Sequence, residues 1–199
     1  NYRAGVNAGD TIASGGNYNV CIGDEAGTAL TTGDNNIAIG FEALTTEDAN
    51  GTNVAIGFRS LKTLNAGADA ENTAVGNNTG LSMTTAVYNT VVGSQAGDAL
   101  TDGSSNTAIG MNALTADTRG QNSVAIGRNA LLAQNFTTST DSYNIAIGRD
   151  AGKAITTGVQ NTIMGSLAGD ALTNANRNVA IGRLALSTDT LGSESTAVG

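Results

Sequence analysis

Residues Asn106–Leu114 read Asn-Thr-Ala-Ile-Gly-Met-Asn-Ala-Leu, and close variants of this stretch recur along the whole chain. In most copies an asparagine comes first, a β-branched, a small and an aliphatic residue follow, and then comes a glycine, here called the motif glycine. Eight of the eleven intervals between motif glycines are 17 residues, and the other three are slightly longer, never shorter. A fixed interval that is sometimes lengthened predicts one structural coil, repeated about twelve times, with insertions in loops. The motif glycines are Gly5, Gly23, Gly40, Gly57, Gly76, Gly93, Gly110, Gly127, Gly148, Gly165, Gly182 and Gly199.

The three residues before each motif glycine predict a short β-strand, because β-branched and small residues alternate there with period two. On such a strand the Val and Ile side chains share one face, and the Asn, Ala and Gly residues share the other. We expect the Val and Ile side chains to fill the interior. We expect the asparagines to form a stacked amide ladder and the glycine to provide a turn or a close backbone approach.

A second apolar segment follows each motif glycine in one of two forms. Form a reads Ala-Gly-x-Ala-Leu, as in Ala26–Leu30, and form b reads Ala-Leu, as in Ala43–Leu44. The coils follow the order a, a, b, b, a, a, b, b, a, a, b, and the two longest intervals, Gly57 to Gly76 and Gly127 to Gly148, both fall in a second b coil. The sequence therefore predicts one all-β domain over residues 1–199, a parallel β-roll or β-solenoid of about twelve coils of ~17 residues. Four-coil units would span about 5–76, 76–148 and 148–199, in a rod roughly 55 Å long.

The alanine face of the predicted strands needs a partner surface. A strip of small side chains along a whole sheet permits close approach of a second chain, and association of three copies around one axis would use it. A monomeric solenoid with a tolerated alanine face is the alternative. Cys21 occupies the same strip and is expected to be a small buried hydrophobe. The candidate trimer-interface residues are Ala38, Ala55, Ala74, Ala108, Ala125, Ala146, Ala180 and Ala197.

The composition argues against several classes of function. The chain has a formal net charge of −8, which disfavours nucleic acid and anionic membranes as partners. No apolar run approaches the ~20 residues of a membrane span, so we expect no membrane insertion in this segment. The chain has no histidine, which excludes histidine-based triads and histidine metal sites. Asp24 and Glu25 are expected in a solvated turn, so we predict no enzyme activity, no metal and no cofactor.

The two inserted loops, Lys62–Glu71 and Leu132–Tyr143, are the predicted receptor-contact regions, because the repeat does not require them. The second loop contains Phe136 and Tyr143, which we expect to be exposed aromatic residues of the kind that anchor contacts. Simple tolerance of insertions in surface loops is the alternative. The candidate contact residues are Lys62, Asn65, Asp69, Gln134, Asn135, Phe136 and Tyr143.

The motifs at Asn53–Gly57 and Asn106–Gly110 resemble the head repeats of trimeric autotransporter adhesins, and equally the repeats of bacteriophage tail fibres, over essentially all of the chain. The resemblance implies a left-handed, homotrimeric β-roll that forms a segment of a longer fibre protein. It also implies attachment to a cell-surface receptor, with glycans among the candidates, and an extracellular location at the cell surface or on a virion tail. The 17-residue period is longer than adhesin heads usually have, and Thr-Gly elements such as Thr32-Gly33 favour the tail-fibre type. The trimeric acyltransferases with a similar helix rely on a histidine base, which this chain lacks.

Two further functions remain as alternatives to attachment. A purely structural extracellular filament or spacer would have the same fold without a binding surface. An ice-binding solenoid is suggested by paired threonines in the turns, such as Thr31-Thr32 and Thr84-Thr85. That row of threonines is interrupted by Lys62, Leu132 and Asn174.

Overall fold

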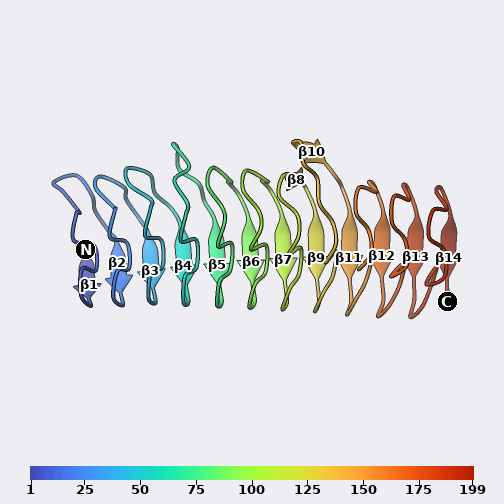
Figure 1. Ribbon diagram of the computed structural model, residues 1–199. Coiled ribbons are helices and arrows are strands. Elements are labelled where there is room, and N and C mark those ends of the chain that lie inside the picture. The colour runs from blue at the N-terminus through green and yellow to red at the C-terminus, as the bar shows by residue number, and fades with distance from the viewer.

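The computed structural model describes all residues from 1 to 199 and contains only strands, turns and loops. The coils stack side by side into a straight rod, with the two ends of the chain at opposite ends of the rod (Figure 1). One sheet of twelve strands runs the whole length, and two short strands form a second sheet. The long sheet contains β1 (Tyr2–Ala4), β2 (Val20–Ile22), β3 (Ile37–Ile39), β4 (Val54–Ile56), β5 (Thr73–Val75), β6 (Thr90–Val92), β7 (Thr107–Ile109), β9 (Val124–Ile126), β11 (Ile145–Ile147), β12 (Thr162–Met164), β13 (Val179–Ile181) and β14 (Thr196–Val198). The short sheet contains β8 (Gly120–Gln121) and β10 (Thr140–Asp141).

The strands of the long sheet pair in parallel, each with its equivalent in the next coil. Ala38 is opposite Ala55, and Ala125 is opposite Ala146 although the longer insertion lies between them. The insertions therefore leave the register of the sheet unchanged. These observations confirm the prediction of a parallel β-solenoid of about twelve coils.

The motif glycines permit the close stacking of successive coils. A Cβ added to Gly57 would lie 2.2 Å from the carbonyl oxygen of Gly76, which is far inside contact distance. The φ angle of Gly57 is +132°, a region that residues with a side chain rarely adopt. The prediction of a close backbone approach at this position is confirmed.

The asparagine that precedes ten of the twelve strands of the long sheet forms the predicted ladder, mainly through the backbone. The side-chain oxygen of Asn19 accepts the backbone N–H of Asn36 at 2.8 Å, and that of Asn36 accepts the N–H of Asn53 at 3.0 Å. The amide nitrogen of Asn19 donates to the carbonyl oxygen of Gly33 at 2.7 Å. Each buried asparagine thus satisfies backbone groups at two places, which explains why the residue recurs.

The predicted orientation of the strands is wrong. The middle residue of each strand from β2 to β13 in the long sheet is buried inside its own coil, and the residues on either side are half-buried or exposed. The interior of a 17-residue coil is narrow, and Leu side chains from the opposite segment already occupy most of it. In most coils only a small side chain fits beneath the strand, so the alanine face points inward.

This orientation also overturns the predicted trimer-interface residues. Seven of the eight alanines are completely buried within one chain and cannot contact another, and Ala197, in the last coil, is partly buried. Cys21 is buried among them, as expected. The alanines concerned are Ala38, Ala55, Ala74, Ala108, Ala125, Ala146, Ala180 and Ala197.

The two coil forms are two ways of filling the same interior. The fourth residue after the motif glycine has a left-handed backbone in both forms, for example Gly97 with φ of 55° and Leu114 with φ of 54°. In form b this residue is a leucine whose side chain enters the core. In form a it is a glycine, and the leucine three residues later covers it: a Cβ on Gly97 would lie 3.0 Å from Leu100. Both leucines are completely buried.

Candidate functional site

The second inserted loop, Leu132–Tyr143, forms an ordered projection on the rod, here called the ridge. Its strand β10 pairs in parallel with β8 of the preceding coil, with Thr140 opposite Gly120 and Asp141 opposite Gln121. This short sheet lies above the long sheet in the view of Figure 1, at the edge of the coil where the loop projects. The inserted residues therefore extend the solenoid by one local layer.

A buried polar network holds this ridge from below. One carboxylate oxygen of Asp117 accepts the backbone N–H groups of Gly120 at 3.0 Å and Phe136 at 3.1 Å. The other accepts the side-chain nitrogen of Gln134 at 2.6 Å. The side-chain oxygen of Gln134 accepts the amide nitrogen of Asn144 at 2.8 Å. Since Asp117, Gln134 and Asn144 are completely buried, this network fixes the base of the loop.

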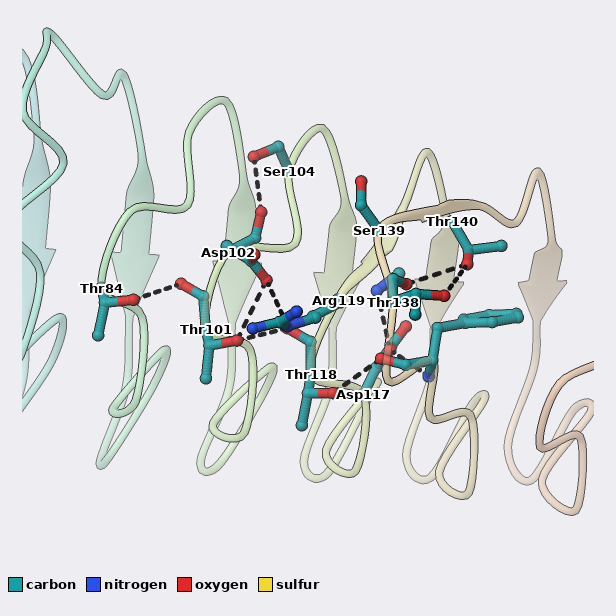
Figure 2. Close-up of polar contacts among 12 residues, drawn as sticks. Thr84, Thr101, Asp102, Ser104, Asp117, Thr118, Arg119, Thr138, Ser139 and Thr140 are labelled. Atoms are coloured by element: carbon teal, nitrogen blue, oxygen red, sulfur yellow. Dashed lines mark hydrogen bonds and ion pairs between the residues drawn. The ribbon is translucent and has the colours of Figure 1, made fainter.

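The outer surface of the ridge carries hydroxyl and amide groups. Gln121 donates from its side-chain nitrogen to Ser139 Oγ at 2.7 Å, and Asn122 donates to Asp141 Oδ1 at 2.7 Å. Figure 2 shows polar side chains of the ridge beside a row of threonines from the preceding coils. Tyr143 follows β10 and is 53% exposed.

The threonine row is a second ladder along the rod. The hydroxyl of Thr84 donates to the carbonyl oxygen of Thr101 at 3.1 Å, and that of Thr101 donates to the carbonyl oxygen of Thr118 at 3.1 Å. The hydroxyl of Thr118 donates to the carbonyl oxygen of Phe136 at 2.8 Å. Figure 2 shows how the row leads into the ridge. These hydroxyl groups therefore link neighbouring coils of the same chain by hydrogen bonds.

The structure separates the predicted contact residues of the second loop into two groups. Asn135 and Tyr143 are exposed, as a contact role requires. Gln134 is completely buried and Phe136 is only 6% exposed, so the expectation of a displayed Phe136 is wrong. Gln134 occupies the repeat position of the core residue Leu100, and the backbone N–H of Phe136 is held by the buried Asp117.

In the first loop, Asn65 and Asp69 are exposed and Lys62 is half-buried. Lys62 Nζ lies 2.7 Å from Glu42 Oε2, which also pairs with Arg59 Nε at 2.6 Å. These two cations lower the pKa of Glu42, with the hydrogen bond from Lys62 as the largest cause. The two inserted loops lie four coils apart on the same side of the rod, about 19 Å, so they do not form one site.

A buried acid also anchors the first loop, but less completely. Glu47 lies seven residues after its motif glycine, as Asp117 does, and is completely buried. One of its oxygens accepts the side-chain nitrogen of Asn50 at 3.1 Å, and the nearby backbone N–H of Ala66 lowers the pKa of the carboxyl. Its Oε2 is buried without a partner. Burial raises the pKa of Glu47 above the usual 4.5.

The first and third residues of the strands form an exposed apolar surface, here called the outer face. From β2 to β14 these positions of the long sheet hold only Val, Ile, Thr and Met. Ile109, Ile145, Met164 and Ile181 are 36–39% exposed. Continuous exposed apolar surface of this kind is typical of interaction sites. This surface was not expected from the sequence, because the Val and Ile residues were predicted to lie in the interior.

An aromatic pair lies just after strands β3 and β4, each ring on the residue that follows the motif glycine. The rings of Phe41 and Phe58 stack with centroids 5.5 Å apart, and the guanidinium of Arg59 lies 4.8 Å from the Phe58 centroid. Both phenylalanines are 41% exposed. They widen the apolar surface at coils three and four.

The side chains offer little reactive chemistry. Asp24 accepts the backbone N–H of Val6 at 2.9 Å, and Glu25 accepts the side-chain nitrogen of Asn7 at 2.8 Å. Both acids therefore bind neighbouring turns. No group of three Cys, Asp or Glu side chains is arranged to hold a metal ion. Burial raises the pKa of the Cys21 thiol.

Comparison with models of protein families, with curated proteins and with solved structures finds no match for the chain. The chain contains no helix long and apolar enough to cross a membrane.

Proposed function

We propose that the chain is a segment of a homotrimeric attachment fibre, whose chains associate through the outer face. The observation that carries this proposal is the absence of charge on that face. None of the eleven successive strands of the long sheet from β2 to β14 places a charged residue there, although the chain has 9 basic and 17 acidic residues. A solvated sheet face in an acidic protein would be expected to carry some of those charges. Their exclusion supports burial of the face against another surface.

The repeat of the face supports a second copy of this chain as the partner. Its side chains recur every ~4.8 Å along the rod. A partner that contacts it along its length must have the same repeat, and another copy of the rod has it. Strands of three residues over twelve coils give roughly 500 Å² per chain. Phe41 and Phe58, which follow their motif glycines, add apolar area at coils three and four. A standard interface buries ~800 Å² per partner.

The trimeric state, the left-handed coil and the extracellular location follow from the resemblance to adhesin and tail-fibre repeats. Association around a threefold axis would place the outer faces inside and leave the ridge and the first loop outside. A structural filament or spacer would assemble in the same way but bind no other molecule. An ice-binding role is less favoured, because threonines such as Thr84 and Thr101 donate their hydroxyl hydrogens within the chain.

The first test is the mass in solution, measured by light scattering on a size-exclusion column. A trimer has three times the mass of the single chain, which is 19.8 kDa. The variant Ile56→Lys/Ile109→Lys places two charges on the outer face and should yield monomers. The control Gln95→Lys adds a charge at an exposed position off that face and should leave the trimer intact.

Circular dichroism should show that both variants keep the strand content of the wild type. A wild-type mass of 19.8 kDa, or a double-lysine variant that remains at three times that mass, would contradict the proposed assembly. Adhesion of the wild-type assembly to host cells, compared with an inert rod of the same length, then separates an attachment fibre from a spacer.

A further inference from the structure

Aromatic side chains lie almost entirely on the surface of this protein. The chain has four tyrosines and three phenylalanines. Phe136 alone is buried. Aromatic residues usually supply a large share of core and interface area. Here the core is built from Ala and Leu, so the exposed aromatic rings are available for contacts with other molecules.

Three of the tyrosines occupy the same position in the repeat, five residues before the motif glycine. Tyr18, Tyr88 and Tyr143 are 78%, 56% and 53% exposed. Residues at this position stack in register, since the backbone N–H of Tyr88 donates to Ala70 at 2.8 Å and that of Ser105 donates to Val87 at 3.0 Å. They form one continuous edge of the rod, here called the tyrosine edge. Its other members are Asn35, Thr52, Glu71, Ser105, Asn122, Gln160, Arg177 and Glu194.

The coil itself does not call for tyrosine at this edge. Every residue of the edge has a left-handed backbone, with φ from 48° to 64°. Asparagine adopts this conformation readily, and bulky side chains adopt it rarely. Tyrosine at three of the positions therefore costs stability and adds nothing to the core. A binding role accounts for this choice.

The chemistry of the edge fits a neutral sugar. A tyrosine ring is flat and apolar and carries a hydroxyl group, and it loses little conformational freedom on binding. The side chains of Ser105, Asn122 and Gln160 lie between and beside the tyrosines. Asn122 Nδ2 donates to Asp141 and Gln160 Oε1 accepts from Arg177, which leaves the Ser105 hydroxyl, Asn122 Oδ1 and Gln160 Nε2 for a ligand. A pyranose ring has an apolar face of C–H groups and a rim of hydroxyls that such side chains can bond. The net charge of −8 disfavours acidic polymers.

The spacing fits an extended polymer. Tyr18 and Tyr88 are four coils apart, about 19 Å, and Tyr88 and Tyr143 are three coils apart, about 14 Å. One pyranose unit of an extended polysaccharide advances by a length comparable to one coil. A chain that runs along the rod can therefore meet all three tyrosines, and the second and third contacts would form at a high effective concentration.

We propose that the tyrosine edge binds an extended neutral polysaccharide parallel to the axis of the rod. The proposal rests on the attachment function and names its receptor class. It assigns recognition to a repeated edge of the solenoid as well as to the ridge, since Tyr143 belongs to both.

The test is affinity electrophoresis and biolayer interferometry with laminarin, dextran and galactomannan, three neutral polysaccharides of different linkage. Alginate is the acidic control. At least one neutral polymer should bind, alginate should not, and tetrasaccharides of the bound polymer should bind at least roughly 100-fold more weakly. The variant Tyr88→Ala should weaken binding of the polymer roughly tenfold, and Tyr18→Ala/Tyr88→Ala/Tyr143→Ala should abolish it.

The matched control is Tyr2→Ala, because Tyr2 is 61% exposed but lies on β1, outside the edge. It should bind as the wild type does. The proposal is overturned if no neutral polymer binds, if the triple variant binds normally, or if Tyr2→Ala has the same effect. Loss of the wild-type mass in the triple variant would also overturn it, since the tyrosines would then be assembly contacts. A trimer that adheres to cells but binds no polysaccharide refutes this inference alone, and a monomer that binds polysaccharide refutes only the proposed assembly.

Discussion

Glu47 is a completely buried acid with one unpartnered carboxylate oxygen. Its replacement by glutamine tests how much this buried acid destabilises the fold. Its Oε2 has no hydrogen-bond partner, while its other contacts hold Asn50 and the backbone of Ala66 at the base of the first loop. Leu30 and Leu64 occupy the same repeat position in the two neighbouring coils and are completely buried. Asp48 is the nearby acid, and it raises the pKa of Glu47 further. Glutamine already occupies this position in coil eight, as Gln134.

The sign of the effect follows from the raised pKa. Below pH 4.5, the usual value for glutamic acid, Glu47 is protonated in the folded and the unfolded chain, and the fold has its full stability. As the pH rises toward the higher pKa of the folded state, the unfolded chain releases its proton first. The free energy of unfolding therefore falls, and it becomes constant above the folded pKa. Glu47→Gln removes this dependence.

The magnitude follows from the negative charge on the unpartnered oxygen, because the amide nitrogen that Glu47→Gln places there would be unpartnered but neutral. A buried polar atom without a partner costs about 1–3 kcal/mol, and more if it is charged. The rod is only one coil thick, so water lies close to Glu47 and we take the lower end of the range. Glu47→Gln should therefore raise the free energy of unfolding by about 1 kcal/mol at pH 7 and leave it nearly unchanged at pH 4.

The assay is hydrogen exchange of the segment 62–71 at pH 4 and pH 7, with urea unfolding as the global measure. A local probe is needed because solenoids open locally as well as globally. The matched control is Asp117→Asn, which replaces an acceptor by an amide nitrogen facing the donor Gln134, and should lower stability by about 1–3 kcal/mol. Equal protection of the segment in wild type and Glu47→Gln at pH 7 would refute the reasoning.

Two further predictions concern packing within and between coils. Ala108→Val should lower the free energy of unfolding by about 1–3 kcal/mol, because Leu114 fills the space beneath the strand in that coil. Ala146→Val should be tolerated, because Gly152 occupies the equivalent position in its coil and leaves room. Thermal unfolding of the two variants compares them, and equal midpoints would contradict the packing argument. Gly57→Ala should destabilise more strongly, since the added carbon would lie 2.2 Å from a backbone oxygen. Gly67→Ala, where a Cβ meets nothing within 4 Å, should cost only about 1–2 kcal/mol of backbone strain, and urea unfolding measures both.

The period of the coil, the parallel register and the role of the motif glycine could be predicted from the sequence. All three depend on spacing along the chain, and spacing is preserved when equivalent residues stack. The asparagine ladder could be predicted for the same reason. Stacked coils place Asn36 beside Asn19 and Asn53 regardless of which face of the strand points inward.

The inward face could not be predicted from alternation, because period two distinguishes two faces without ranking them. Larger apolar residues were placed inside, as in an ordinary domain. Here the larger residues of the strand point outward and alanine points inward, because Leu30 and its equivalents already fill the interior of the coil. The asparagines contained the missing signal: they share a face with the alanines, and their hydrogen bonds to buried backbone groups require the interior.

The partial burial of the second loop had a similar signal in the sequence. Counting from the motif glycine Gly127, Gln134 is the seventh residue, and the seventh residue after Gly93 is the core residue Leu100. Gln134 therefore belongs to the coil and not to the insertion. The buried network around it could not be predicted, since it joins residues from two coils that only the fold brings together.

The two coil forms follow from a constraint on total volume beneath each strand. Where the middle strand residue is larger than alanine, as at Cys21, Val91 and Ile163, the coil that follows has form a. Its glycine leaves room: a Cβ on Gly97 would lie 3.0 Å from Val91, and one on Gly169 would lie 2.6 Å from Ile163.

In form b the fourth residue after the motif glycine is a leucine, and the middle residue of the strand before it is alanine. The seventh residue after the motif glycine is then free to be a polar side chain. In the first b coil this side chain is Glu47 or Asp117. Asp117 accepts the backbone N–H of Phe136 in the next coil, and Glu47 lies near the backbone N–H of Ala66 in the next coil. Both insertions begin at the coil that such an acid anchors. Form b thus provides a buried acceptor for a chain that leaves the repeat, and this explains why the insertions fall in the second b coil and leave the sheet in register.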